Sequence, residues 1–181
     1  AADDILKHIL KNDPENEFPL NNRALMAFPS GSVFKVITGY AALEEEVIGR
    51  TNSVVCGGTW LGLGREFPKS CWGFHGSISF ISAMSQSCNS YFYELGLKLY
   101  RKNNNAGELL QKYARLFGLG SPTGIDVPYE SAGLVPDREW KRQYFSENRE
   151  NSVWFPGDTV NMAIGQGDVL ITPLQLARVY M

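Results

Sequence analysis

The sequence predicts a mostly helical chain with few strands. Apolar residues recur at helical spacing in several segments, whereas residues 53–76 are rich in glycine and contain two cysteines and two tryptophans, which favours an irregular hairpin. Hydrophobic residues make up 44% of the 181 residues and charged residues 20%, as in an ordinary globular protein with a substantial core. A formal charge of -2 gives no reason to expect nucleic acid as a partner.

The predicted elements follow one another with short breaks. A short amphipathic helix is predicted over residues 5–11, before a polar loop. The turn residues Pro29-Ser30-Gly31 then lead into an apolar run, which predicts a helix from Ser32 to near Gly49, where glycine can adopt a left-handed cap. After the hairpin, an extended segment is expected at 125–128 and further helices at residues 77–85, 90–101, 106–117, 137–144, 159–164 and 173–181.

The first turn of the helix that begins at Ser32 carries a candidate nucleophile and base. Ser32 and Lys35 are three residues apart, so an α-helix places them on one face, where their side chains can meet. Serine needs a neighbour to accept its proton, and lysine serves only when neutral, which burial and the positive end of the helix dipole both favour. Backbone N–H groups at the same terminus could stabilise an oxyanion. Taken alone, Ser-x-x-Lys is more often a helix cap followed by a solvated lysine.

A second candidate group lies between two predicted helices. Ser87 and Asn89 are two residues apart in a loop, so their side chains can point to the same side. There the hydroxyl could relay a proton, and the amide could hold a substrate carbonyl or the lysine. Serine and asparagine are also favoured as helix caps, which is the alternative interpretation.

Together these two motifs resemble the first two of the three motifs of penicillin-binding proteins and serine β-lactamases: Ser-x-x-Lys, Ser-x-Asn and Lys-Thr-Gly. Further segments resemble the penicillin-binding protein 2 family of class B D,D-transpeptidases: Pro19-Leu20-Asn21-Asn22-Arg23-Ala24, His75-Gly76, Pro122-Thr123-Gly124-Ile125-Asp126, Pro136-Asp137-Arg138-Glu139-Trp140 and Ile164-Gly165-Gln166-Gly167. The resemblance covers nearly the whole chain from Pro19. It implies an α/β (α+β) fold with an antiparallel sheet between helices, of which this chain is chiefly the helical side plus the small hairpin.

The resemblance implies a serine enzyme that cross-links peptidoglycan through an acyl-enzyme and is inhibited covalently by β-lactams. Ser32 would attack the D-alanyl-D-alanine stem peptide or a β-lactam, and Lys35 would be the base. Ser87 would relay a proton to the leaving nitrogen, and Asn89 would orient the donor peptide. A serine β-lactamase or D,D-carboxypeptidase, which hydrolyses the same acyl-enzyme, and a non-catalytic β-lactam sensor are alternatives.

The resemblance also implies a cellular setting. The family works with a lipid II-polymerising glycosyltransferase of the elongation complex. It acts at the extracytoplasmic face of the bacterial cytoplasmic membrane, held there by an N-terminal anchor that we expect to be absent from these residues.

Two departures from the family pattern bear on activity. The usual Pro-Pro-Gly-Ser reads Pro29-Ser30-Gly31-Ser32, which keeps the turn glycine. No Lys-Thr-Gly occurs in the chain, and in the family this motif helps to form the oxyanion hole and to bind the substrate carboxylate. We therefore expect residues 1–181 to be a partial transpeptidase domain that is catalytically incomplete, since loss of one oxyanion donor typically costs about 10²- to 10³-fold in rate.

All three cysteines lie close in sequence to one histidine. Cys71 and His75 have the short spacing of metal ligands, and Cys56 adds a third ligand from the glycine-rich segment. Cys88 would complete a Cys₃His tetrahedron, the usual geometry of a structural zinc. A disulfide between Cys56 and Cys71, or a buried Cys88 that acts as a small hydrophobe, are the alternatives. A zinc site is similar to one found in some family members, and would tie the hairpin insert at 53–76 to the second motif; no cofactor is expected for catalysis.

Overall fold

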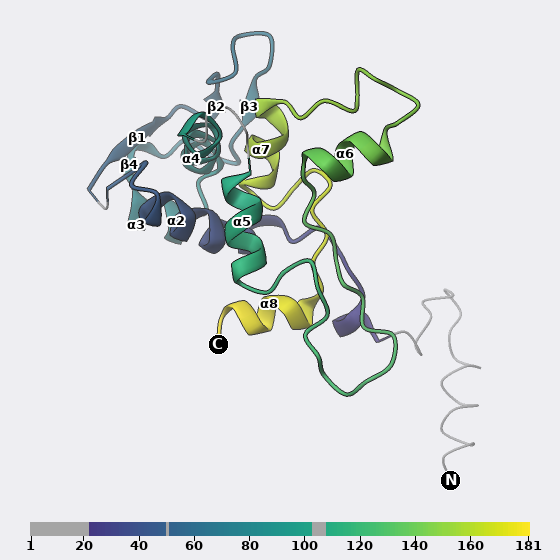
Figure 1. The fold of residues 1–181 in the computed structure, drawn as a ribbon. Coiled ribbons are helices and arrows are strands. Elements are labelled where there is room, and N and C mark those ends of the chain that lie inside the picture. The colour runs from purple at the N-terminus through teal and green to yellow at the C-terminus, as the bar shows by residue number, and fades with distance from the viewer. Residues whose placement is uncertain (1–21, 50, 103–107) are drawn as a thin grey trace, which may run out of the picture.

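The computed structural model describes residues 22–49, 51–102 and 108–181 (Figure 1). The helical elements are η1 Arg23–Leu25, η2 Gly31–Phe34, α2 Lys35–Glu44, α3 Phe80–Ser85, α4 Asn89–Lys102, α5 Leu109–Leu116, α6 Arg138–Tyr144, α7 Pro156–Met162 and α8 Pro173–Val179. The strands are β1 Ser53–Cys56, β2 Thr59–Trp60, β3 Lys69–Ser70 and β4 Gly76–Ser79. The described part is therefore mostly helical with a small hairpin, as predicted, and the helix predicted over residues 5–11 lies outside it.

Helix α4 forms the centre of the hydrophobic core. Aromatic and leucine side chains recur along it at helical spacing, and four of them are no more than 1% exposed: Tyr91, Phe92, Leu95 and Leu99. The helix packs against α2, α5 and α7 (Figure 1). Gly96 permits the close approach of the α7 end, because a Cβ at this position would lie 2.7 Å from the Cβ of Ala163. The core therefore joins segments that lie far apart in the sequence.

The glycine-rich segment forms two short antiparallel ladders, one inside the other. Strand β1 pairs with β4, so that Cys56 lies opposite Gly76, and β2 pairs with β3 between them. The backbone N–H of His75 donates to the carbonyl of Cys56 at 3.2 Å, which brings these two residues together at the end of the outer ladder. The prediction of an irregular hairpin is confirmed.

The helix predicted from Ser77 begins later, at Phe80. Ser77 and Ile78 instead belong to β4, where they pair with Val55 and Val54 of β1. Only Ile78 of this strand is buried, and the pairing with β1, not the spacing of apolar residues, defines the strand. The sequence prediction was wrong here because local spacing does not reveal the partner strand.

Helix α2 also differs from its prediction at both ends. It begins with a 3₁₀ turn, η2, and it ends at Glu44 rather than near Gly49. Glu46 takes the left-handed conformation, with φ 53°, and the N–H of Val47 donates to the carbonyl of Ala42 at 3.0 Å. These are the features of a Schellman cap, so the helix closes at a glutamate although glycine is the usual residue there.

The last helices are close to their predictions, and two of them have proline in the first turn. Helix α7 begins at Pro156, three residues before the predicted start, and α8 begins at Pro173 as predicted. At α8 the Thr172 side chain accepts from the N–H of Gln175, whose side chain accepts in turn from the N–H of Thr172. No helix in the described ranges is long and apolar enough to cross a bilayer.

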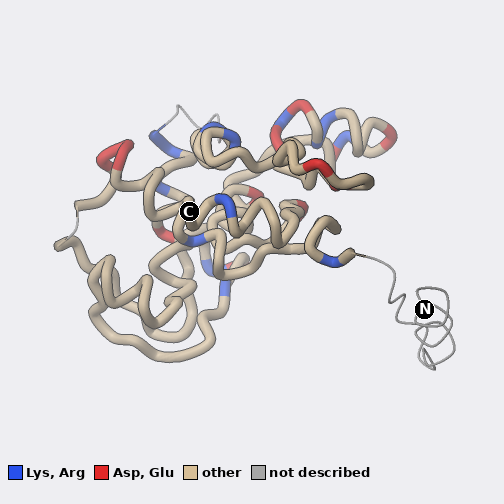
Figure 2. Tube along the Cα trace, turned by 90° about the horizontal axis from the view of Figure 1, so that it is seen from below, with Lys and Arg blue, Asp and Glu red and all other residues tan. Residues whose placement is uncertain are grey.

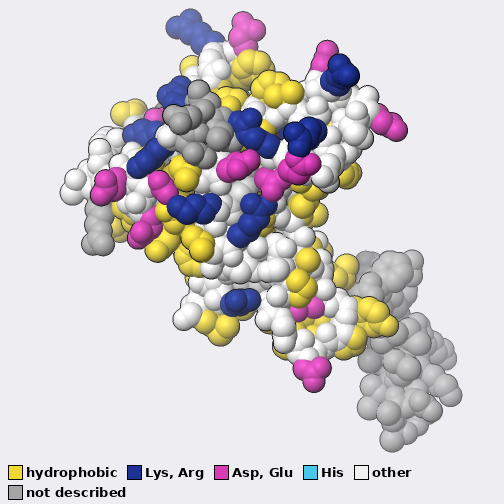
Figure 3. Space-filling view, viewed as in Figure 1, with side chains coloured by type: hydrophobic (Ala, Val, Ile, Leu, Met, Phe, Trp, Pro, Cys, Tyr) yellow, Lys and Arg dark blue, Asp and Glu magenta, His cyan; other side chains and the backbone are white. Residues whose placement is uncertain are grey.

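Charge is unevenly distributed along the fold. Residues 70–93 contain no Lys, Arg, Asp or Glu, so they form an unbroken tan stretch in Figure 2. On the face drawn in Figure 3, by contrast, positive and negative side chains are intermixed, without a large surface of one sign. The uncharged stretch covers the second half of the hairpin, α3 and the start of α4, which surround the second motif.

Candidate active site

Lys35 stands at the start of α2 and is 1% exposed. Its Nζ donates to three oxygens: the Ser87 carbonyl at 2.8 Å, the Ser87 Oγ at 2.9 Å and the Asn89 Oδ1 at 2.6 Å. These three bonds account for all three hydrogens of an ammonium group. The structure thus joins the lysine of the first motif to both polar residues of the second.

The surroundings of Lys35 favour its neutral form. Burial lowers the pKa of Lys35 to about 8, and the nearby Cys71 and Cys88 act in the opposite direction on this pKa. Among the described residues, the hydrogen-bond partners of Nζ are all neutral oxygens and include no carboxylate, and the Phe92 ring centroid lies 5.4 Å from Nζ. An amine with a pKa of about 8 is a competent base near neutral pH, whereas an ordinary lysine is not.

The loop between α3 and α4 presents the second motif to Lys35. Ser87 has φ 52°, a left-handed conformation that is uncommon for a residue with a side chain. Two backbone bonds close the loop, from the Ser87 N–H to the Met84 carbonyl and from the Cys88 N–H to the Ala83 carbonyl. Asn89 is the first residue of α4. The loop therefore directs both the carbonyl and the hydroxyl of Ser87 toward the lysine.

Ser32 lies in the 3₁₀ turn directly before Lys35, and it is exposed. The expected contact between the two side chains is not formed in the described part of the chain: the Ser87 loop receives the hydrogens of Lys35 Nζ. The backbone carbonyl of Ser32 accepts from the N–H of Lys35. The hydroxyl is thus left open to a reaction partner, one turn away from the amine.

Gly165 supports the turn that carries Ser32, a role that sequence reasoning did not assign to it. The Gly31 N–H donates to the Gly165 carbonyl at 2.8 Å, and Thr38 Oγ1 of α2 donates to the nearby Ala163 carbonyl at 2.9 Å. Gly165 has φ 69°, and a Cβ there would lie 2.1 Å from the Gly31 carbonyl oxygen. The only signal in the sequence was the segment Ile164-Gly165-Gln166-Gly167, which is identified by resemblance and not by pattern.

Gly165→Ala is expected to lower the free energy of unfolding by about 2 kcal/mol and to slow any reaction at Ser32 about tenfold, because the new Cβ must displace the Gly31 turn. Thermal unfolding and the rate of labelling by a fluorescent penicillin measure the two effects. Gly157→Ala is the matched control, since a Cβ there meets Leu63 Cδ1 at an ordinary 3.8 Å. Equal behaviour of the two variants would contradict the supporting role of Gly165.

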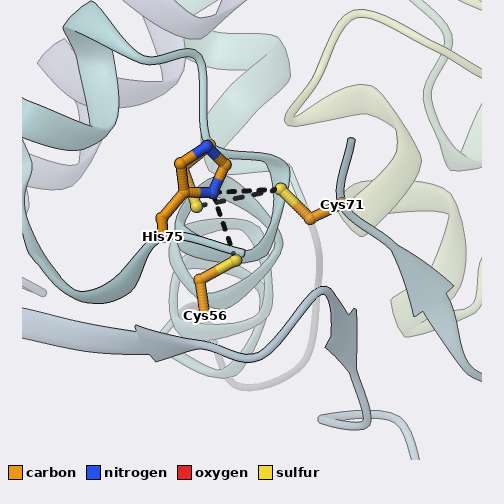
Figure 4. Close-up of side chains that lie close together, drawn as sticks. Cys56, Cys71 and His75 are labelled. Atoms are coloured by element: carbon orange, nitrogen blue, oxygen red, sulfur yellow. Dashed lines mark hydrogen bonds between the residues drawn. The ribbon is translucent and has the colours of Figure 1, made fainter. Parts of the chain in front are cut away.

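The three cysteines and His75 meet behind the second motif. Their ligand atoms all lie within 4.8 Å of one another. His75 Nδ1 is 3.3 Å from the Cys56 Sγ and 3.6 Å from the Cys71 Sγ (Figure 4), and the Cys71 and Cys88 sulfurs are 3.9 Å apart. All three cysteines are unpaired, so the alternative disulfide between Cys56 and Cys71 is not formed in this structure.

These distances fit a tetrahedral zinc. Bond lengths of about 2.3 Å to sulfur and about 2.0 Å to nitrogen separate two sulfur ligands by about 3.8 Å and a sulfur from a nitrogen by about 3.5 Å. The donor set, three thiols and one imidazole, is also one that structural zinc sites use. Four protein ligands would leave no open position on such an ion, so its effect would be to cross-link the chain.

The family model for the penicillin binding protein transpeptidase domain matches residues 4–181. The peptidoglycan D,D-transpeptidase MrdA of Acinetobacter baumannii is 33% identical over 162 residues, which are 88% of this chain and 22% of that protein. The structure of Pseudomonas aeruginosa PBP2 in complex with WCK 5153 aligns with a TM-score of 0.82 at 32% identity, over 96% of this chain and 38% of that one.

A second solved structure is described as "Structural coordination of polymerization and crosslinking by a peptidoglycan synthase complex". One of its chains aligns with a TM-score of 0.78 at 33% identity, over 98% of this chain and 28% of that one. The chain spans less than two thirds of each of these proteins, but the family match covers nearly all of the chain. The chain therefore belongs to the penicillin-binding protein transpeptidase family, among the class B proteins that resemble penicillin-binding protein 2.

Proposed function

We propose that this chain carries the acylating residues of a serine D,D-transpeptidase that cross-links peptidoglycan stem peptides. The observation that supports this most directly is the buried Lys35 amine, bonded to Ser87 and Asn89 one turn after an exposed Ser32. After Lys35 loses one proton, its nitrogen retains two hydrogens for the loop and gains a lone pair for the Ser32 hydroxyl.

The proposed reaction has two halves. Ser32 Oγ bonds to the penultimate D-alanine carbonyl carbon, and its proton passes to Lys35 Nζ. The amide C–N bond then breaks, and Ser87 relays a proton to the nitrogen of the departing D-alanine while Asn89 holds the donor peptide. An amino group of a second stem peptide next attacks the acyl carbon, the ester bond to Ser32 Oγ breaks as the new amide forms, and a proton of the attacking amine passes through Lys35 to Ser32 Oγ. A β-lactam would enter the first half and remain on Ser32.

The setting of the intact protein is proposed from its relatives. The synthase complex named above supports a partner that polymerises glycan strands from lipid II, and the family relationship supports β-lactam binding. Peptidoglycan lies outside the cytoplasmic membrane, so we place the intact protein at the extracytoplasmic face of that membrane. The proposal includes no role for nucleic acid.

Two alternatives use the same residues. A β-lactamase or D,D-carboxypeptidase would hydrolyse its acyl-enzyme, and a β-lactam sensor would keep the adduct without transferring it to an amine. The identity of 33% to a D,D-transpeptidase favours transfer over both. Hydrolytic turnover of the acyl-enzyme distinguishes a β-lactamase or D,D-carboxypeptidase from a transpeptidase. Cross-linking of stem peptides by the intact protein distinguishes a transpeptidase from a β-lactam sensor.

Labelling of the intact protein with a fluorescent penicillin tests the proposal. We expect a stable adduct on the peptide that contains Ser32 and no adduct in Ser32→Ala. The 181 residues alone contain no Lys-Thr-Gly, so we expect them to label at least about 10²-fold more slowly than the intact protein. An adduct on another serine, or rapid hydrolysis of the β-lactam without a lasting adduct, would contradict the proposed transpeptidase.

We also propose that Cys56, Cys71, His75 and Cys88 hold a structural zinc ion. The fit of the four ligand atoms to a tetrahedron supports this. The ion would join the hairpin to Cys88, which lies between the two residues of the second motif. It would take no part in the reaction, and its contribution would be to fix the loop that meets Lys35.

A further inference from the structure

The indole of Trp72 contacts the second motif directly. Its Nε1–H donates to the Gln86 carbonyl at 3.1 Å and to the Ser87 carbonyl at 3.2 Å. The indole and the His75 ring pack edge to face, with the ring centroids 4.9 Å apart. The Ser87 carbonyl thus accepts two hydrogen bonds, one from Trp72 and one from Lys35 at 2.8 Å.

We propose that Trp72 is a positioning residue, which holds the Ser87 peptide unit where its carbonyl and hydroxyl meet Lys35. This inference rests on the proposed function, because it assigns a purpose to the contact between Lys35 and the loop. It concerns the indole N–H itself, and it holds whether or not the neighbouring Cys71 and His75 bind a metal.

Packing does not account for the position of Trp72. The residue is 69% exposed, so it buries little of its apolar surface and contributes little to the hydrophobic core. What it does supply is one donor, which points at two consecutive backbone carbonyls. An exposed tryptophan whose N–H meets the backbone and whose ring contacts His75 is suited to fix that backbone and poorly suited to stabilise a core.

The backbone that Trp72 holds is the one that needs support. Ser87 keeps a left-handed conformation with φ 52°, which for a residue with a Cβ persists only when the surroundings impose it. The Ser87 and Cys88 N–H groups fix the loop from the α3 side. Trp72 fixes the carbonyl side. Without the indole bond, the Ser87 peptide unit could rotate, and the rotation would move the carbonyl away from Lys35 Nζ.

Trp72→Phe in the intact protein tests this inference, because phenylalanine keeps an aromatic ring and removes the donor. We expect the acylation rate at saturating penicillin to fall about tenfold, with the half-saturating concentration changed less than twofold. Trp60→Phe is the matched control. This variant also removes a hydrogen bond made by an indole of the hairpin, the one that Trp60 Nε1 donates to Glu94 Oε2 at 3.2 Å. The folded fraction of Trp60→Phe should acylate at the wild-type rate.

Amide hydrogen exchange over residues 84–89 gives a second measurement that needs no reaction with penicillin. We expect faster exchange at Cys88 in Trp72→Phe and unchanged exchange in Trp60→Phe. A Trp72→Phe protein with wild-type acylation and exchange would overturn the positioning role, as would equal effects of the two variants. Failure of the wild-type protein to acylate at all would instead overturn the proposed function, and the exchange result would then decide the role of Trp72.

Discussion

Lys35→Met is expected to reduce the acylation rate of the intact protein by about 10³-fold at pH 7. Methionine has a similar length and suits a site that is 1% exposed, but it cannot accept the proton of Ser32. It also removes the donor that meets Ser87 and Asn89. Quenched-flow labelling with a fluorescent penicillin measures the rate, and mass spectrometry of the Ser32 peptide identifies the adduct.

Lys141→Met is the matched control for this variant. Lys141 is 7% exposed, and its Nζ is 2.6 Å from the Asp158 carboxylate, so its replacement also removes a buried lysine from a hydrogen bond. We expect it to lower stability, because the Asp158 carboxylate loses its cation and keeps only the Phe155 N–H, and to leave the acylation rate of the folded protein unchanged. If Lys35→Met acylates within tenfold of the wild type, or if both variants lose activity alike, Lys35 is not the base.

The pH dependence of acylation follows from the same amine. Burial lowers the pKa of Lys35 from 10.5 to about 8, so about a tenth of the amine is neutral at pH 7. Because the neutral amine is the proposed base, we expect activity to be gained as the pH rises through the pKa of Lys35 in the folded protein. We expect the rate to increase about tenfold per pH unit below about pH 7 and to level off above about pH 8. A rate that is flat between pH 6 and pH 8 would contradict this assignment.

Spacing along the chain was sufficient to find Lys35 but not to describe its contacts. Counting residues along a helix paired Lys35 with Ser32, and the Asn89 amide was expected to hold either the lysine or a substrate carbonyl. The structure forms the bond to Asn89 and adds bonds to Ser87, both more than fifty positions after Lys35. Those bonds depend on how α2 packs on α4, which no local pattern contains. The motifs could be recognised from the sequence because each is local. Their joint geometry belongs to the tertiary fold.

The same distinction explains the other differences. The end of α2 was placed at a glycine, because glycine is the usual left-handed residue, yet Glu46 closes the helix through bonds that depend on the packing around it. Gly165 gave no local signal of its own, since its importance lies in the absence of a Cβ next to Gly31. The cysteine cluster could be predicted because most of its members lie in one hairpin, where chain connectivity itself brings them together.

Removal of zinc is expected to lower the unfolding temperature of the intact protein by about 10 °C and to slow acylation at Ser32. The two ladders of the hairpin are only two and four residues long, and an isolated two-stranded ladder of this size is marginally stable in water. An ion bound to Cys56, Cys71, His75 and Cys88 would fasten both ladders to the start of α4. Its loss would release the backbone on either side of Cys88, and with it the oxygens that meet Lys35.

The measurement begins with elemental analysis, which should find about one zinc per chain in protein purified without chelator. His75→Gln should lose the ion and reproduce the chelated protein, whereas His8→Gln, at the only other histidine, should keep it. Restoring zinc to the chelated wild type should recover both stability and acylation, and restoring it to His75→Gln should recover neither. Protein without stoichiometric zinc, or a Cys56–Cys71 disulfide in the purified protein, would contradict the proposed zinc site. The Ser87 loop would then depend on hydrogen bonds alone, so that Trp72→Phe would be expected to have a larger effect on acylation.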